Sequence, residues 1–136
     1  MSPDFAYETA VFHLDDSGAI GVGAKADVLG ADRGRPELMS GRLVTVFAYA
    51  ADWDFRERHP DGDELVVVLQ GEIDLVLDQG AGEHAVRVGQ GRASVIPAGA
   101  WHRIAVHEPA TLLFVTPVPA RTEHEWLAAT GGRKLT

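Results

Sequence analysis

Glycine and proline divide this sequence into short segments, and that spacing most constrains its fold. The chain has 15 Gly and 7 Pro in 136 residues, and the apolar residues between them follow no 3.6-residue period. Short apolar runs bounded by turn residues are typical of β-strands. We therefore predict an all-β sandwich or barrel, with strands at about 6–14, 43–50, 53–59, 64–70, 72–78, 84–88, 93–96, 101–107 and 111–116.

Two segments fall outside this pattern of strands. Residues 18–40 are rich in Gly, Asp and Arg and are predicted to form a long loop. Residues 123–130 precede Gly131-Gly132 and are predicted to form a short helix, with Trp126 and Leu127 as its apolar anchors. The chain length is that of a single domain.

Charge and cysteine content exclude several classes of function. Twenty acidic and 12 basic residues give a formal charge of −8, and no local basic patch offsets it. We expect neither nucleic acid nor a membrane as partner. The absence of cysteine excludes disulfides, thiolate metal ligands and cysteine nucleophiles. The N-terminal sequence MSPDFAYETA has no features of a secretory signal, so we expect a cytoplasmic protein.

Two polar side chains fall on an apolar face of the predicted strand 53–59. Because side chains alternate between the faces of a strand, Trp53 and Phe55 share a face with Glu57 and His59. A carboxylate and an imidazole beside two aromatic side chains need a partner that satisfies them. This is the first indication of a functional site.

The segment after this strand brings in a second carboxylate. Pro60-Asp61-Gly62-Asp63 is a strong turn signal, with both aspartates as turn formers, and it predicts a hairpin between 53–59 and 64–70. The hairpin would set His59 opposite or nearly opposite Glu64, with Cβ atoms about 4.5–5.5 Å apart. Since 64–70 is apolar on both faces, we expect Glu64 to point into an apolar interior.

A third strand adds another imidazole. In 101–107, His102 shares its face with Ile104 and Val106, and a turn at 97–100 places His102 at the start of the strand. Any one such residue alone is more often a hydrogen-bonded core residue or a solvated strand end than a ligand. Their joint occurrence is what indicates a site.

These residues resemble the two motifs of the cupin superfamily. The family motifs are Gly-x5-His-x-His-x3-4-Glu-x6-Gly and Gly-x5-Pro-x-Gly-x2-His-x3-Asn. This sequence has Glu57-x-His59-x4-Glu64-x6-Gly71, followed by Gly91-x5-Pro97-x-Gly99-x2-His102-x3-Val106. The chain is similar to small single-domain cupins over about residues 40–118, preceded by a strand and loop in 1–39 and followed by a tail in 119–136.

The resemblance implies a double-stranded β-helix, or jelly-roll barrel, that holds one divalent metal ion inside. His59, His102 and Glu64 match metal ligands of the family. Glu57 stands where the family has its first histidine, Ala51 replaces the opening glycine, and Val106 replaces the closing asparagine. The usual set of three histidines and one glutamate is therefore altered.

The role of Glu57 has three interpretations. As a fourth ligand it makes a site of two histidines and two carboxylates, suited to Fe(II) or Mn(II). As a non-ligand it leaves His59, Glu64 and His102 as a set with open positions, typical of non-haem Fe(II) oxygenases, and is free to move protons. In the third interpretation the site has decayed, and Glu57 pairs with a nearby Arg or a protonated His. Zn(II) and Ni(II) also suit these ligands, so the ion is Fe, Mn, Zn or Ni.

The resemblance leads to a function hypothesis. We expect a mononuclear metal-dependent, dioxygenase-like enzyme with Glu57 as catalytic residue, although isomerase and hydrolase chemistry stay open. Its substrate would be a small aromatic or keto compound, because the expected pocket is mostly apolar: Trp53, Phe55, Val66, Val68, Ile104 and Val106. The alternatives are a non-catalytic small-molecule-binding or sensor barrel and a scaffold for a dimer. Many family members pair, so a homodimer is expected.

Other histidines are weaker candidates. His84 shares a face with Val86 and could line the interior, but no motif position includes it. The remaining three are interpreted as surface or packing residues: His13, His107 and His124. Without a cation, the crowded carboxylates are expected to raise each other's pKa, so metal should stabilise the fold.

Overall fold

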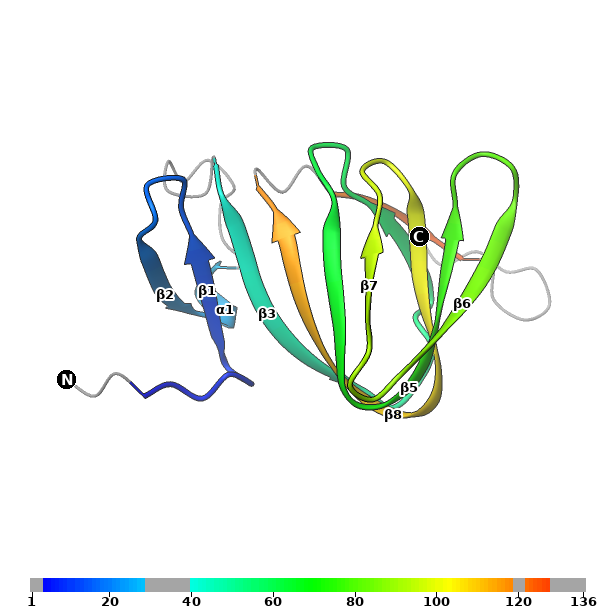
Figure 1. The fold of residues 1–136 in the computed structure, drawn as a ribbon, viewed down its shortest axis with the longest axis horizontal. Coiled ribbons are helices and arrows are strands. Elements are labelled where there is room, and N and C mark those ends of the chain that lie inside the picture. The colour runs from blue at the N-terminus through cyan, green and yellow to red at the C-terminus, as the bar shows by residue number, and fades with distance from the viewer. Residues whose placement is uncertain (1–3, 29–39, 119–121, 128–136) are drawn as a thin grey trace.

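A computed structural model describes residues 4–28, 40–118 and 122–127, and most of these residues lie in β-strands (Figure 1). The predicted all-β class is confirmed. The described elements, in chain order, are β1 (Ala10–Leu14), β2 (Ile20–Ala24), α1 (Lys25–Val28), β3 (Arg42–Tyr49), β4 (Phe55–Arg58), β5 (Glu64–Asp78), β6 (Glu83–Gly89), β7 (Ala93–Ile96), β8 (Trp101–Pro117) and β9 (Glu123–Trp126).

Two long strands, β5 and β8, organise the barrel. Each joins two strands that were predicted separately, and the two pair antiparallel along most of their length. The first half of β5 pairs with β7 and its second half with β6. The first half of β8 pairs with β4 and its second half with β3. Both long strands bend between these halves, so that the two parts of the sheet face each other as a jelly-roll barrel (Figure 1).

The bend depends on a close approach of the two long strands. Their register shifts between Val68 and Ile73, where Gly71 has a φ of +83°. A Cβ at Gly71 would lie 2.2 Å from the carbonyl oxygen of Pro109, which is far inside van der Waals contact. Only glycine therefore fits this position without moving the backbone of β8.

Gly71→Ala is expected to destabilise the fold by on the order of 3 kcal/mol, because a left-handed conformation and a backbone clash both oppose a Cβ there. Gly91→Ala is a matched control. Its φ is +80°, but nothing lies within 4 Å of the added Cβ. Urea denaturation of the two variants separates the clash from the strain. Equal losses of unfolding free energy would contradict the close approach.

The hydrophobic core lies between the two parts of the bent sheet. Its fully buried members come mainly from the long strands, and the cluster also includes Trp53. A smaller cluster forms beside the N-terminal hairpin, where Val11 packs with Leu43 and Val118. The barrel therefore offers a rigid, mostly apolar frame for any polar group placed inside it.

The prediction of a helix at 123–130 was wrong over the described residues. Glu123–Trp126 is β9, and residues 128–130 lie outside the described part of the chain. β9 pairs antiparallel with β4, which leaves one edge open to receive it. Arg56 and Arg58 form ion pairs with Glu125 and Glu123 across this edge. Sheet pairing overrides the local helical pattern because β4 would otherwise expose its backbone groups.

The N-terminal part also differs from the prediction. The first strand begins at Ala10 rather than residue 6, after a turn closed by the hydrogen bond from Thr9 N to the carbonyl of Ala6. Within the predicted long loop, β2 pairs with β1 and the short helix α1 follows, while residues 29–39 lie outside the described ranges. No helix among the described residues is long and apolar enough to cross a membrane.

Candidate metal centre

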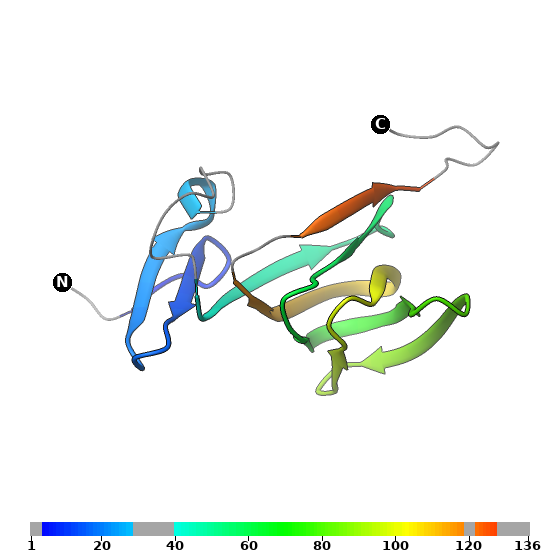
Figure 2. The same cartoon turned by 90° about the horizontal axis from the view of Figure 1, so that it is seen from above.

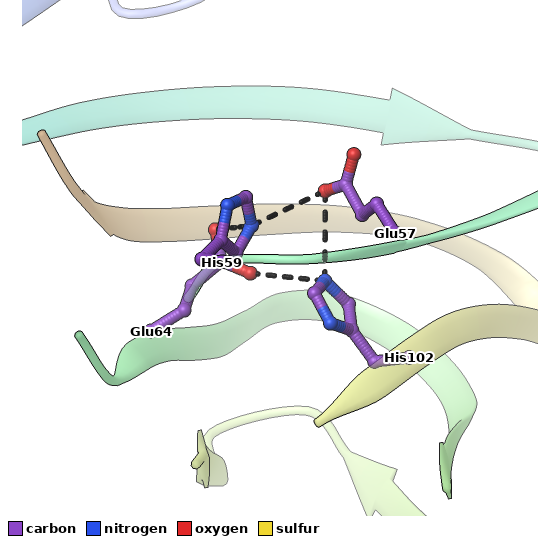
Figure 3. A group of neighbouring side chains, drawn as sticks. All are labelled: Glu57, His59, Glu64 and His102. Carbon is purple, nitrogen blue, oxygen red and sulfur yellow. Dashed lines mark ion pairs between the residues drawn. The ribbon is translucent and has the colours of Figure 1, made fainter. Parts of the chain in front are cut away.

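Four side chains of the predicted site come together inside the barrel (Figure 3). Glu57 comes from β4, His59 directly follows it, Glu64 begins β5, and His102 is the second residue of β8. One ligand atom of each lies within 4.8 Å of the ligand atoms of the other three. The four positions singled out in the sequence therefore form one cluster.

The predicted hairpin between 53–59 and 64–70 was wrong, although its turn is present. β4 pairs with β8 and β9, whereas β5 pairs with β6, β7 and β8. The turn after His59 is held by the segment between β7 and β8. Gly99 N donates to the His59 carbonyl, and Ala98 N donates to Asp63 Oδ1. His59 and Glu64 thus meet across the barrel interior rather than across a strand ladder.

The cluster is deeply buried and its contacts converge on one point. His59, Glu64 and His102 are 6%, 3% and 1% exposed. Glu57 Oε1 lies 3.5 Å from Nε2 of each imidazole, and the Glu64 oxygens lie 3.3 Å from His59 Nε2 and 3.2 Å from His102 Nε2 (Figure 3). None of these contacts has hydrogen-bond geometry. His59 Nε2, His102 Nε2 and Glu64 Oε1 are buried without a hydrogen-bond partner.

The inner atoms of the cluster are the Nε2 and Oε1 atoms that face its centre. The other polar atoms of these side chains, the outer atoms, have partners that orient the inner ones. His102 Nδ1 lies 3.3 Å from the carbonyl of Ala100, which can only accept, so Nδ1 carries the proton. His59 Nδ1 lies 2.9 Å from Thr122 Oγ1. Thr116 donates its hydroxyl proton to Glu64 Oε2 at 2.6 Å. Each neutral imidazole can therefore aim its Nε2 lone pair at the centre.

The mutual contacts shift the pKa of every group in the cluster. Burial disfavours the charged form of Glu57, but contacts with His102 and His59 outweigh it and lower its pKa to about 2. Burial opposes protonation of both histidines, but contacts with Glu57 and Glu64 raise the pKa of each to about 9. The pKa of Glu64 is lowered in the same way, against burial, by His102 and His59.

The expected rise in carboxylate pKa was therefore wrong for the metal-free protein. The raised pKa values of the two imidazoles favour their protonated forms, whose positive charges compensate the two carboxylates. A divalent ion carries the charge of those two protons, and its ligands would be the same four inner atoms. Buried unpartnered nitrogen and oxygen atoms that face one point fit such an ion, so the cluster is a candidate metal site.

A cavity of about 310 Å³ adjoins the cluster. Trp53 and Phe55 line it, as predicted. Val66, Val68 and Ile104 do not, because they are fully buried and fill the core, and Val106 packs against that core. The described lining residues are Val28, Leu43, Thr45, Phe47, Tyr49, Trp53, Phe55, Glu57, His59, Glu64, Phe114, Thr116, Val118, Thr122 and His124.

The predictions for the histidines outside the cluster are confirmed in part. His13 contacts the Ser40 carbonyl and His107 contacts the Asp74 carboxylate, both near the surface, as expected. His84 is exposed on β6, so the suggestion that it lines the interior was wrong.

Sequence reasoning missed the part that His124 plays. Its Nε2 lies 2.9 Å from Glu57 Oε2, and it lines the cavity. The signal was the period-2 alternation in 123–126, which puts His124 and Trp126 on one face of a strand and two glutamates on the other.

Comparison with known proteins identifies one matching family and several similar structures. A model of the cupin domain family matches residues 46–116, just over half of the chain. A cupin-2 domain containing protein from Shewanella frigidimarina has 18% sequence identity and a TM-score of 0.48, covering 56% of this chain and 70% of that one. A protein of unknown function from Streptococcus pyogenes has 30% identity and a TM-score of 0.49, covering 57% and 65%.

A third similar structure is larger. It is the hydroxypropylphosphonic acid epoxidase from S. wedmorenis in complex with fosfomycin, with 20% identity and a TM-score of 0.48. The alignment covers 55% of this chain and 43% of the epoxidase, so this chain spans less than half of that protein. A comparison with curated proteins found no match.

Proposed function

The chain belongs to the cupin domain family, and we propose that it is a mononuclear metal-dependent, dioxygenase-like enzyme that acts on a small organic molecule. The observation that carries this proposal is the group of buried, unpartnered atoms His59 Nε2, His102 Nε2 and Glu64 Oε1, which face one another beside a cavity. Such atoms are costly in an apolar barrel unless a ligand satisfies them.

The four inner side chains have distinct tasks in this proposal. His59, Glu64 and His102 would hold the ion, and Glu57 Oε1 would be its fourth ligand, since one ligand atom of each of the four residues lies within 4.8 Å of the others. The ion would be Fe, Mn, Zn or Ni, and when bound it supplies Lewis-acid activation of substrate or dioxygen. The apolar surroundings strengthen each charge interaction at the centre.

Glu57 is also the residue we propose to handle protons. It is the least buried carboxylate of the cluster, with its side chain 16% exposed, and it lines the cavity. Its place on the cavity wall supports this role, because a carboxylate there can meet a substrate proton directly. The same residue can serve as ligand through Oε1 and still line the cavity.

The cavity favours a small aromatic or keto compound as substrate. Phe47, Tyr49, Trp53 and Phe55 follow one another along its wall, with Trp53 and Phe55 stacked at 4.5 Å between ring centroids. Planar apolar molecules gain most from burial against such rings. Burial raises the pKa of Tyr49 to about 12, so its hydroxyl stays protonated and can donate to a carbonyl oxygen.

The test uses protein purified without a nickel column, loaded separately with Fe(II), Mn(II), Zn(II) and Ni(II). We expect oxygen consumption with one of the redox-active ions in the presence of a small phenol or diketone. Glu57→Gln should then lower kcat more than it lowers metal affinity, because an amide cannot accept the proton. Bound metal without turnover on any substrate of the panel would favour the alternative, a non-catalytic binding barrel.

A further inference from the structure

The C-terminal segment 122–127 contacts the candidate centre through two side chains that are not in the cluster itself. Thr122 directly precedes β9, and its Oγ1 lies 2.9 Å from Nδ1 of His59. His124 lies on β9, and its Nε2 lies 2.9 Å from Oε2 of Glu57. Both contacts reach the outer atoms of the two candidate ligands, on the side away from the centre. They lie outside the segment that matches the cupin family model.

The two contacts leave a single donor atom of each ligand free for the centre. A hydroxyl oxygen of Thr122 that accepts the Nδ1 proton of His59 leaves the Nε2 lone pair directed inward. A His124 Nε2–H that donates to Glu57 Oε2 engages that oxygen, so Oε1 alone faces both imidazoles at 3.5 Å. The partners of a ligand's outer atoms set its orientation and basicity.

The strand itself is held by contacts that do not involve the site. Backbone pairing joins it to β4 over four residue pairs, from Phe55 with Trp126 to Arg58 with Glu123. Arg56 Nη2 lies 3.0 Å from Glu125 Oε1 on the opposite face of the strand from His124. Leu127 N donates to the carbonyl of Asp54. Figure 2 shows β9, in orange, at the edge of the molecule. Removing the imidazole of His124 therefore leaves most of the docking contacts in place.

We infer that His124 on β9 and Thr122 just before it are positioning residues, which hold Glu57 and His59 in the geometry that binds the metal ion. The inference rests on the proposed function. It assigns to the C-terminal segment a part in completing the site, in addition to covering the edge of β4.

The test is titration of the metal-free protein with Co(II). Calorimetry measures the Kd, and the visible d–d absorption reports the geometry of the bound ion. His124→Ala and Thr122→Val are each expected to raise the Kd for Co(II) about 10–100-fold. His124→Ala should also change the d–d bands, because Glu57 is free to bind through both oxygens or to turn away. His124→Gln and Thr122→Ser restore a polar partner and should recover part of the affinity.

Glu125→Gln is the matched control on the same strand. It removes the exposed ion pair with Arg56 but touches no candidate ligand, so its Kd should stay within about twofold of the wild-type value. An equal loss of affinity in Glu125→Gln and His124→Ala would overturn the inference, because strand docking would then explain both. Wild-type affinity and bands in both His124→Ala and Thr122→Val would overturn it too. A wild-type protein that binds no Co(II) would instead overturn the proposed function.

Discussion

Replacing His102 by alanine is expected to abolish stoichiometric binding of the metal ion. His102 is 1% exposed, and its Nε2 lies 3.2 Å from Glu64 and 3.5 Å from Glu57. The substitution removes a nitrogen ligand and leaves two carboxylates facing one imidazole. Since loss of a ligand's outer partner alone weakens metal sites about 10–100-fold, loss of the ligand itself should weaken this one by more.

Elemental analysis after gel filtration measures the effect directly. The wild-type protein should carry about one equivalent of a divalent ion after loading, and the His102→Ala variant should carry almost none. His107→Ala is the control on the same strand, because His107 pairs with Asp74 at the surface and touches no residue of the cluster. A His102→Ala variant that keeps a full equivalent would show that the ion binds elsewhere.

Metal affinity is expected to rise steeply with pH between about 6 and 8. In the metal-free protein the pKa of both His59 and His102 is raised to about 9, so both imidazoles hold a proton throughout this range. A metal ligand must be the neutral imidazole, and binding therefore releases up to two protons. The apparent Kd should fall on the order of 100-fold per pH unit. Calorimetry in two buffers of different ionisation enthalpy counts the released protons.

The unfolding free energy of the metal-free protein should fall as the pH rises above about 6.5, whereas metal affinity rises. A histidine pKa raised from 6.5 to about 9 stabilises the fold fully below pH 6.5, and that contribution is lost as the pH rises through 9. The pKa of Glu57, lowered from 4.5 to about 2, stabilises the fold above pH 4.5, and that contribution is lost as the pH falls toward 2. The metal-free protein should therefore be most stable between about pH 4.5 and 6.5.

Thermal melts across the pH range test this coupling. The difference in Tm between loaded and metal-free protein should be small at pH 5 and large at pH 8, because protons compete with the ion for the same imidazoles. A difference that does not change with pH would mean that the cluster exchanges no protons on binding. His102→Ala should lose most of the difference at every pH, whereas His107→Ala should keep it.

The candidate ligands could be predicted because their chemistry conflicts with the local pattern. Glu57, His59, Glu64 and His102 each interrupt an apolar alternation, and such an interruption is visible in the sequence without any knowledge of pairing. The period-2 pattern and the turn residues likewise predict strands and their approximate ends. The structure brings these four side chains into one cluster, in which Glu57 is half-buried and the other three are buried.

Pairing between strands could not be predicted in the same way. The turn at 60–63 is compatible with a hairpin, but β5 pairs with β7 and β8 and not with β4. Residues 64–70 and 72–78 are separated by Gly71, which locally resembles a turn between two strands. In the fold this glycine instead allows one strand to bend past Pro109. A turn signal specifies backbone conformation, and long-range contacts decide what the turn connects.

By itself the sequence determined that the chain is built from strands and that a buried carboxylate and imidazole site lies within them, because alternation and turn chemistry are local properties. Only the tertiary structure decided that β9 is a strand, and that Thr122 and His124 contact His59 and Glu57. Those contacts join residues more than sixty positions apart along the chain. Their formation depends on the open edge of β4, which exists only once the barrel has formed.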